Sequence, residues 1–254
     1  MKIITSCFLA LLCSAPPALA DSFDPRLADQ TFVDMRYKHR DIVRQYAMDF
    51  AVLRFENIRT VGGDWHLWSR LELNGVSTNL PAADNRLSQW HTGAGDTLAH
   101  LALLTSVAPG TRIGFGVQVG LPTANRDSLG YGRYVVAPAA AVEQDLPIGE
   151  RGSFVGIIVR EQYDVGGDTS RGKIRMGIYQ PTLHYRLPAG YFIELNPEAR
   201  YNRRANDTWF TSMAVSAGRY FADRSALQFS FARQTQDDYL VFEREFELRY
   251  AKWF

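Results

Sequence analysis

The chain has 254 residues, of which 46% are hydrophobic and 13% aromatic, and its 28 Lys and Arg residues nearly balance 27 Asp and Glu residues. A balance this even provides no positive field that would attract nucleic acid. Cys7 and Cys13, the two cysteines, both lie near the start of the chain, so a disulfide scaffold and a cysteine metal site are excluded for the rest of it.

The first twenty residues have the pattern of a secretory signal peptide. Lys2 precedes an apolar run at residues 3–12, and the small residues Ala18 and Ala20 form a cleavage site. The run is shorter than the roughly 20 residues that a membrane-spanning helix needs. We therefore expect residues 1–20 to be a cleaved signal peptide and residues 21–254 to form one domain. A lipoprotein signal at Cys13 is disfavoured because Leu12 precedes it.

Short turns alternate along the chain with longer polar loops. The short turns are expected at residues 108–110, 147–150, 188–190 and 221–224, and the longer loops at residues 74–96, 123–132, 165–172, 202–208 and 234–238. This alternation is typical of the periplasmic and extracellular ends of an outer-membrane barrel. Counting back from the C-terminus predicts about twelve antiparallel strands, the first three at residues 30–37, 44–56 and 64–74, with ten or fourteen strands as alternatives.

Residues 240–254 show which face of these strands is apolar. The following residues are spaced in steps of two and are expected to share one face: Leu240, Phe242, Phe246, Leu248, Tyr250 and Phe254. Charged residues stand between them. In an outer-membrane barrel the apolar face meets lipid and the charged face meets the lumen. The sequence therefore predicts an all-β fold, a transmembrane antiparallel up-and-down barrel, rather than a soluble sandwich.

Other strands alternate in the same way, with one expected irregularity. Residues 113–121 place Phe115 toward lipid and Gly116 toward the lumen. The apolar residues up to Ile178 stand at even-numbered positions, and those from Leu183 onward stand at odd-numbered positions. Both sets are expected to face lipid, so the alternation changes phase near Gln180 and Pro181. Proline cannot donate to a strand ladder, and we therefore expect a β-bulge there.

The inward positions predict a lumen of mixed charge that would line a path for a solute. They are Arg70, Glu72, Arg112, Arg133, Glu143, Arg160, Arg175, Glu194, Glu198, Arg200, Glu243, Glu245, Glu247 and Arg249. Two interpretations stay open: a plug of cross-strand salt bridges, or a narrow conduit whose charges orient the solute.

Small inward residues predict space along one wall, and the longest loop is a candidate to fill it. The small residues are Gly114, Gly116, Gly120, Ala137, Ala139 and Ala141. Residues 74–96 carry Leu80, Leu87 and Trp90, which would gain burial if this loop folded into the lumen as a plug. The space along this wall would either admit a ligand or be filled by this loop, and we expect the loop to fill it.

The residues give little support to catalysis. The five histidines are scattered, and no Ser and His share a strand face at a spacing that sets a nucleophile beside a base. His100 and Asp96 would lie about 13 Å apart on one strand face, too far for a hydrogen bond. No metal-ligand or phosphate-loop motif is present, so neither an enzyme nor a cofactor is predicted. An outer-membrane lipid hydrolase and a closed structural or adhesive barrel remain alternatives.

Four short motifs carry a family resemblance. They are Gly93-Ala94-Gly95-Asp96, Gly120-Leu121-Pro122-Thr123, Gly130-Tyr131-Gly132 followed by Pro138, and Gln180-Pro181. In this order they resemble the outer-membrane transporter-like proteins named for the meta-pathway of phenol degradation. The resemblance implies a bacterial outer-membrane barrel, without catalytic residues, from a group often encoded for uptake of aromatic or other hydrophobic compounds.

The chain departs from that family at two places. Ala124 and Asn125 stand where the family has a glycine, and the first quarter of the chain shows no matching motif. The substrate is therefore not carried over. The overall prediction is a monomeric barrel in the bacterial outer membrane, surrounded by outer-membrane lipid, that passes or takes up a small solute without a cofactor or a nucleic-acid partner.

Overall fold

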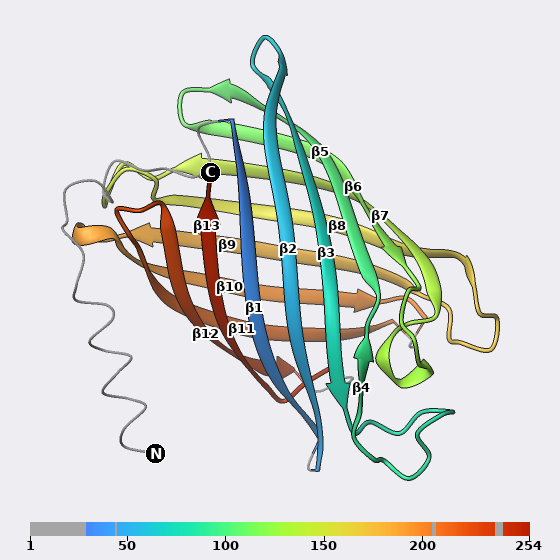
Figure 1. Cartoon of the computed structure of the whole chain (residues 1–254). Helices are drawn as coiled ribbons and strands as arrows, with labels where there is room; N and C mark the ends of the chain where they lie inside the picture. Colours follow the sequence, from blue (N-terminus) through green and yellow to red (C-terminus); the bar gives the residue numbers. More distant parts are fainter. Residues whose placement is uncertain (1–28, 44, 205–206, 237–240) are drawn as a thin grey trace, which may run out of the picture.

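The computed structural model describes residues 29–43, 45–204, 207–236 and 241–254, and the predicted signal peptide at residues 1–20 lies outside them. One antiparallel sheet contains all the strands of the described residues (Figure 1). It closes on itself because β1 pairs with both β2 and β13, and β2 also pairs with β3. Closure gives the edge strands' backbone groups hydrogen-bond partners, which a sheet surrounded by lipid requires.

Twelve long strands make up the barrel wall, as predicted. They are β1 (Gln30–Val43), β2 (Tyr46–Gly62), β3 (Trp65–Thr78), β5 (Thr97–Ala108), β6 (Thr111–Leu121), β7 (Arg133–Asp145), β8 (Phe154–Gly167), β9 (Arg175–Arg186), β10 (Tyr191–Asn202), β11 (Thr208–Tyr220), β12 (Ser225–Gln236) and β13 (Arg244–Trp253). A four-residue strand, β4 (His91–Ala94), pairs with the end of β3. Two single-turn 3-10 helices are η2 (Asp127–Leu129) and η3 (Pro188–Gly190).

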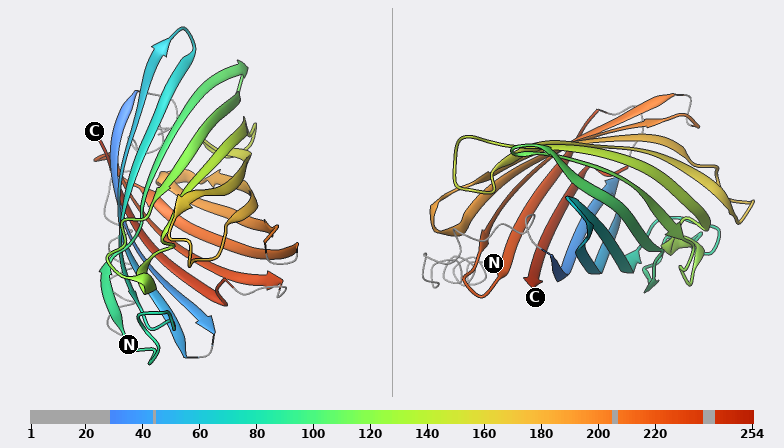
Figure 2. Two further views of the ribbon diagram at one scale, coloured as in Figure 1. Left: turned by 90° about the vertical axis from the view of Figure 1, so that its right-hand side faces the viewer. Right: turned by 90° about the horizontal axis from the view of Figure 1, so that it is seen from above.

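The two ends of the barrel differ in the length of their connections. Tight turns join β2 to β3, β5 to β6 and β11 to β12 at the end that carries the C-terminus (Figure 1). We call it the turn end. The longer connections, which include β4 and η2, lie at the opposite end, the loop end (Figures 1 and 2). This arrangement confirms the predicted alternation of short turns and long loops, except that the turn predicted at residues 147–150 is a longer connection, residues 146–153 between β7 and β8.

The first strands are longer than predicted. The predicted segments at residues 30–37 and 44–56 become β1 and β2, which continue to Val43 and Gly62. The charged residues 38–41 fell between the two predicted segments. In the structure Lys38 and Arg40 instead point inward and meet Glu247 and Glu245 of β13. Because the lumen supplies compensating carboxylates, this charged segment can remain a strand.

Most outward positions are apolar, whereas the inward ones are mainly small or polar, with aromatic clusters near the two ends of the lumen. On β6, Phe115 is 56% exposed on the outer face, whereas its neighbour Gly114 is buried. Leu71, Leu101 and Phe229 lie exposed on other strands in the same way. This inverted polarity is that of a barrel that spans a membrane. Among the residues in the described ranges, no helix is long and apolar enough to cross a membrane.

Two predictions of side-chain direction are wrong. Phe242 was expected to face lipid, but β13 begins only at Arg244, and Phe242 is buried inside against Phe210. The expected bulge at Gln180 and Pro181 is also absent, because β9 pairs with β8 and β10 in one unbroken register. Pro181 removes a hydrogen-bond donor without shifting the strand, so Ile178 faces the lumen and not lipid.

The prediction that residues 74–96 bury apolar side chains as a plug is wrong. β3 extends to Thr78, and the remaining loop leaves Leu87 82% and Trp90 54% exposed. The loop packs sideways on η2, where the imidazole Nδ1 of His91 lies 3.0 Å from the Ser128 hydroxyl. Polar contacts with η2 at the loop end therefore fix the position of this loop, and the loop does not fill the lumen.

Candidate functional site

The barrel interior holds a cavity of about 450 Å³. A cavity of roughly 10 to 15 Å³ already has room for one water, so this one has room for many. Its lining runs from Trp253 and Tyr220 at the turn end to Gln118 and Arg160 near the middle of the barrel. The lumen is therefore not filled by its own side chains.

One wall of the cavity is apolar, and we call it the small-residue wall: Gly114, Gly116, Ala139 and Ala141. These residues lie on β6 and β7, where the sequence predicted a thinly covered surface, and they pair directly in the order Gly114 with Ala141 and Gly116 with Ala139. Strands placed this closely leave space only because their inward side chains are a hydrogen or a methyl group.

The opposite wall is charged, and Asp34 lies at its centre. The Asp34 side chain is fully buried and accepts hydrogen bonds from Arg36 Nε at 2.9 Å and Arg36 Nη2 at 2.8 Å. Arg249 Nη2 lies 2.8 Å and Arg54 Nη1 lies 3.7 Å from the same carboxylate. A buried carboxylate is tolerated only with such compensation.

The ion pairs extend from Asp34 over four adjacent strands. Arg54 Nη2 lies 2.6 Å from Glu72 on β3, and Lys38 Nζ lies 2.8 Å from Glu247 on β13. The charged wall consists of Asp34, Arg36, Lys38, Arg54, Glu56, Arg70, Glu72, Glu245, Glu247 and Arg249. Charges of both signs thus pair with one another along one side of the lumen, and Glu56, Arg70 and Arg249 are the members of the charged wall that line the cavity.

A second group of polar residues connects β3, β5, β6, β8 and β9. Arg70 Nη2 donates to His100 Nδ1 at 3.0 Å, and His100 lies opposite Gln118 in the β5–β6 register. Gln118 Oε1 accepts from Arg160 Nη1 at 2.9 Å, and Arg160 also donates to Gln180. Arg160 can reach Gln118 across β7 because the side chains between them are alanines.

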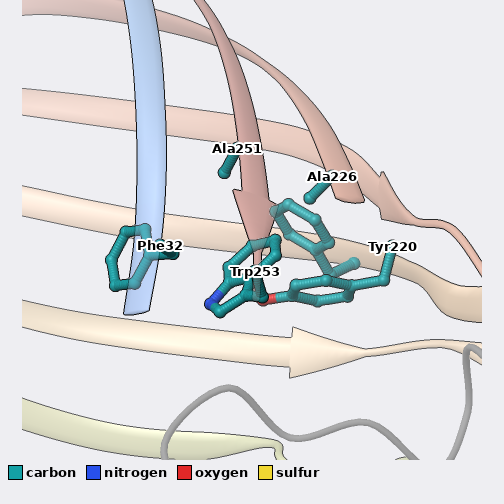
Figure 3. Packing of buried hydrophobic residues seen from close by; sticks show 6 residues of the cluster. Phe32, Tyr220, Ala226, Ala251 and Trp253 are labelled. Atoms are coloured by element: carbon teal, nitrogen blue, oxygen red, sulfur yellow. The ribbon is translucent and has the colours of Figure 1, made fainter. Parts of the chain in front are cut away.

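Aromatic rings enclose the turn end of the cavity (Figure 3). Phe32 and Trp253 have ring centroids 5.4 Å apart, and Trp253 and Tyr220 lie 5.9 Å apart. Phe192 contacts Tyr220 at 4.9 Å and His184 at 5.0 Å. Such tilted contacts are favourable ring geometries. A solute moving through the lumen would meet these rings at the turn end.

A smaller apolar cluster lies inside the loop end. Phe210 and Phe242 pack edge to face with centroids 5.4 Å apart, and Ala232 lies beside them. The Arg40 guanidinium stacks between Phe50 at 4.9 Å and Phe242 at 5.4 Å. Cation–π contacts of this kind hold the arginine against the wall.

Twelve of the predicted lumen residues face the interior, and six of these line the cavity. The six are Arg70, Arg112, Glu143, Arg160, Glu194 and Arg249. Another six lie in the lumen outside the cavity lining: Glu72, Arg133, Glu198, Arg200, Glu245 and Glu247.

The other two predicted residues do not reach the lumen. Arg175 is exposed on the outer side near the loop end and stacks over Tyr163 at 5.9 Å, because β9 keeps a single register and its inward positions are the even-numbered ones. Glu243 is exposed and precedes the first residue of β13.

Sequence reasoning missed the centre of the charged wall and the aromatic turn end. Asp34, Arg36 and Arg54 lie on β1 and β2, two strands for which no inward residues were predicted. A signal for Trp253 was present, since it shares the parity of Glu247 and Arg249 on β13. The rings that meet Trp253 come from β1, β10 and β11, and no sequence spacing connects those strands.

The loop end brings together the three residue types of a hydrolase triad, but not in the geometry of one. His91 Nδ1 lies 3.0 Å from Ser128 Oγ, and Ser128 Oγ donates to Asp84 at 3.3 Å. In a triad the acid orients the second nitrogen of the imidazole. Here Asp84 meets Ser128 and, at 3.9 Å, the same nitrogen Nδ1. Among the residues that the structure describes, no group of three or more His, Cys, Asp or Glu is placed to hold a metal ion.

Comparison with known proteins places the fold among outer-membrane channels. No family model matches the sequence, and no curated protein matches it either. The structure is similar to the COG4313 outer membrane channel from Pseudomonas putida F1, with 18% identity, a TM-score of 0.76, and 92% of this chain and 98% of the other covered.

Two further solved structures share the architecture at a greater distance. The NanC porin has 12% identity and a TM-score of 0.58, with 86% of this chain and 97% of the porin covered. The CymD monoaromatic hydrocarbon channel has 12% identity and a TM-score of 0.56, with 90% of each chain covered. At these identities the likeness concerns the fold, and the fold is the one that these channels and porins use.

Proposed function

We propose that this protein is a channel of the bacterial outer membrane that lets a small solute pass by binding along its lumen. One observation carries the proposal: a barrel with an apolar outer face contains a cavity of about 450 Å³ between a charged wall and the small-residue wall. A protein whose lumen served only to hold its strands together would gain stability by filling that space. The fold shared with channels and porins supports the same function.

The kinship with the family named for the meta-pathway of phenol degradation is a finer part of the proposal. Three of the motifs that suggested it meet at the loop end. The Thr123 hydroxyl donates to the Gly95 carbonyl at 3.1 Å, and the Asp96 carboxylate accepts the backbone N–H of Tyr131 at 2.6 Å. A methyl group on Gly130 would lie 2.5 Å from Asp96 Oδ1, so glycine leaves room for this carboxylate. Shared motifs that build one structural unit support common descent better than separate short matches do.

The proposed partners are the outer-membrane lipid around the barrel and a solute inside it, with the protein acting as a monomer. A closed barrel encloses its lumen within one chain, so passage needs no second copy. CymD, with a comparable barrel, is a monoaromatic hydrocarbon channel, and an aromatic solute is accordingly one class that we propose for this chain.

Two substitutions on neighbouring strands test the channel. Ala141 on β7 lines the cavity, whereas Val155 on β8 is exposed on the outer face and is not part of the cavity lining. Ala141→Phe places a ring in the cavity, and we expect it to reduce single-channel conductance in planar bilayers by more than half. Val155→Phe adds a comparable ring toward lipid and should leave conductance unchanged. Folded wild-type protein that never conducts, or two variants with equal conductance, would contradict the proposal.

A further inference from the structure

The charged residues that line the cavity have an excess of positive charge. Five cationic side chains, Arg70, Arg112, Arg160, Arg186 and Arg249, face three carboxylates, Glu56, Glu143 and Glu194. Most of these groups are matched within the protein. Arg112 contacts Glu143 and Asp145, Arg249 contacts Asp34, and Glu194 accepts from His184 at 2.9 Å. Arg186 donates to the backbone carbonyl of Arg151 at 3.0 Å and stacks on Tyr220 at the turn end. Of the remaining cations, Arg70 and Arg160 have the least complete set of carboxylate partners.

Arg160 forms no ion pair with any of the described residues. Its contacts are the amide oxygens of Gln118 and Gln180, which use two of the five N–H donors of a guanidinium, and its Nε is buried without a hydrogen-bond partner. The nearby carboxylate of Glu198 accepts from Gln180 and from Arg200 instead. A guanidinium enclosed in this way without a carboxylate is an unusually costly arrangement unless an anion completes it.

Arg70 is also incompletely matched. Its Nε is buried without a partner, its Nη2 donates to the His100 ring, and the nearest carboxylate oxygen, of Glu56, lies 3.6 Å from Nη1. Glu56 also lies 3.6 Å from Arg54 and accepts the indole N–H of Trp68. The Arg70 Nη2 atom lies 3.0 Å from His100 Nδ1 and 3.3 Å from His100 Nε2. An arginine N–H can only donate, so the imidazole accepts through an unprotonated nitrogen and adds no negative charge.

An apolar surface adjoins the two arginines. Arg160 lies opposite Ala139 in the β7–β8 register, and Ala139 lies opposite Gly116. Ile158, which also lines the cavity, projects from the same strand as Arg160, and the Trp68 ring lies under Arg70 at 4.8 Å. Cationic donors beside a mainly apolar cavity of this size match the chemistry of small-molecule sites.

We infer that the cavity binds an amphiphilic carboxylate, with the carboxylate held by Arg160 and Arg70 and an aromatic or short alkyl body resting on the small-residue wall. The inference rests on the proposed channel function and specifies its solute class. Guanidinium groups bind carboxylates through paired, charge-assisted hydrogen bonds. A neutral molecule of the same shape would leave both arginines unmatched, and a cation would be repelled by them.

Benzoate is the probe, and benzyl alcohol and benzylamine are the neutral and cationic controls of similar shape. The full chain, purified and inserted into planar bilayers, should show a current block by benzoate that the two controls match only at concentrations at least tenfold higher. Arg160→Gln and Arg70→Gln should each raise the half-blocking concentration of benzoate about tenfold, the loss expected for one charge-assisted contact. Arg175→Gln, on the outer face, is the matched control and should change nothing.

Arg160→Lys keeps the charge without the guanidinium fork and covers the case in which Arg160→Gln does not fold. It should give a half-blocking concentration between those of the wild type and the glutamine variants. Equal block by the three ligands, stronger block by benzylamine, or block that no arginine variant changes would overturn the inference while leaving the channel intact. Titration calorimetry separates the two proposals. Benzoate binding that depends on Arg160 without any current would support the site and refute the channel.

Discussion

Asp34 is the carboxylate that three arginines of the charged wall share. Arg36 donates two hydrogen bonds to it, and Arg54 and Arg249 approach it from β2 and β13. The parity of each strand could not predict that these residues meet. Their meeting depends on the order in which β13, β1 and β2 close the barrel, which pairs residues more than 200 positions apart.

Replacing Asp34 with asparagine should strongly destabilise the barrel. Asp34→Asn preserves side-chain size but leaves three buried guanidinium groups without their common counter-charge, so we expect the free energy of unfolding to fall by about 3 to 5 kcal/mol. Urea unfolding of the detergent-solubilised protein, followed by tryptophan fluorescence, measures this change.

The control for Asp34→Asn is Asp223→Asn in the turn between β11 and β12. Hydrogen bonds from Ser225, and an ion pair with Lys252, hold the pKa of Asp223 below its ordinary value, so it is ionised at neutral pH. It is exposed, and exposed ion pairs contribute about 1 kcal/mol or less. If Asp34→Asn destabilises the protein no more than Asp223→Asn, then Asp34 does not organise the charged wall.

The facing of a strand was predictable where apolar and polar or small residues alternate without exception along it. It was not predictable where that alternation is interrupted. On β6 the alternation of apolar residues with glycine fixed both the strand and its facing. On β1 the period of two is present, but charged residues occupy inward and outward positions alike, as Arg40 and Asp41 show. On β9 the apolar residues change parity at Pro181 because Ile178 turns into the lumen, which local sequence cannot distinguish from a bulge.

The glycines of β6 differ in how closely other strands approach them. A methyl group on Gly116 would lie 2.5 Å from the Leu101 carbonyl oxygen, a backbone atom that cannot move aside. On Gly114 it would meet only the end of the flexible Leu104 side chain, at 2.6 Å. We expect Gly116→Ala to cost about 1 to 3 kcal/mol through overpacking and strand displacement, and Gly114→Ala less than that.

Both glycine variants keep the same residue type on the same lumen face, so the difference between them isolates the backbone contact. Equilibrium urea unfolding gives the two free energies, and the slower migration of heat-unfolded barrels in gels checks that each variant folds. Equal losses for Gly116→Ala and Gly114→Ala would show that the spacing between β5 and β6 adjusts freely and that the close approach has no structural importance.

At the scale of the whole molecule, the central feature is the sidedness of the barrel, by which we mean an apolar outer face and a charged inner face. The outer face must be apolar for lipid, and this leaves the charged residues enclosed, where they pair along one wall and spare the other. Composition and strand parity predicted the sidedness and the small-residue wall. They could not predict which charges would pair, because a plug and a half-open lumen use the same inward residues.

Two adjacent residues of β12 test this sidedness directly. Phe229 is exposed on the outer face, whereas Ser230 faces the lumen, hydrogen-bonds Ser216 at 2.8 Å and lies opposite Glu247. A lysine on the lipid side near the middle of a strand costs about 2 to 4 kcal/mol. Phe229→Lys should therefore lower the free energy of unfolding in lipid vesicles by that amount. Ser230→Lys gains a carboxylate neighbour and should change the free energy of unfolding by less than about 1 kcal/mol.

In a soluble sandwich the outcome would be reversed, because the phenylalanine row would form the core and the serine row would meet water. The order of these two variants thus separates the membrane barrel from the fold that the same strand periodicity could otherwise describe.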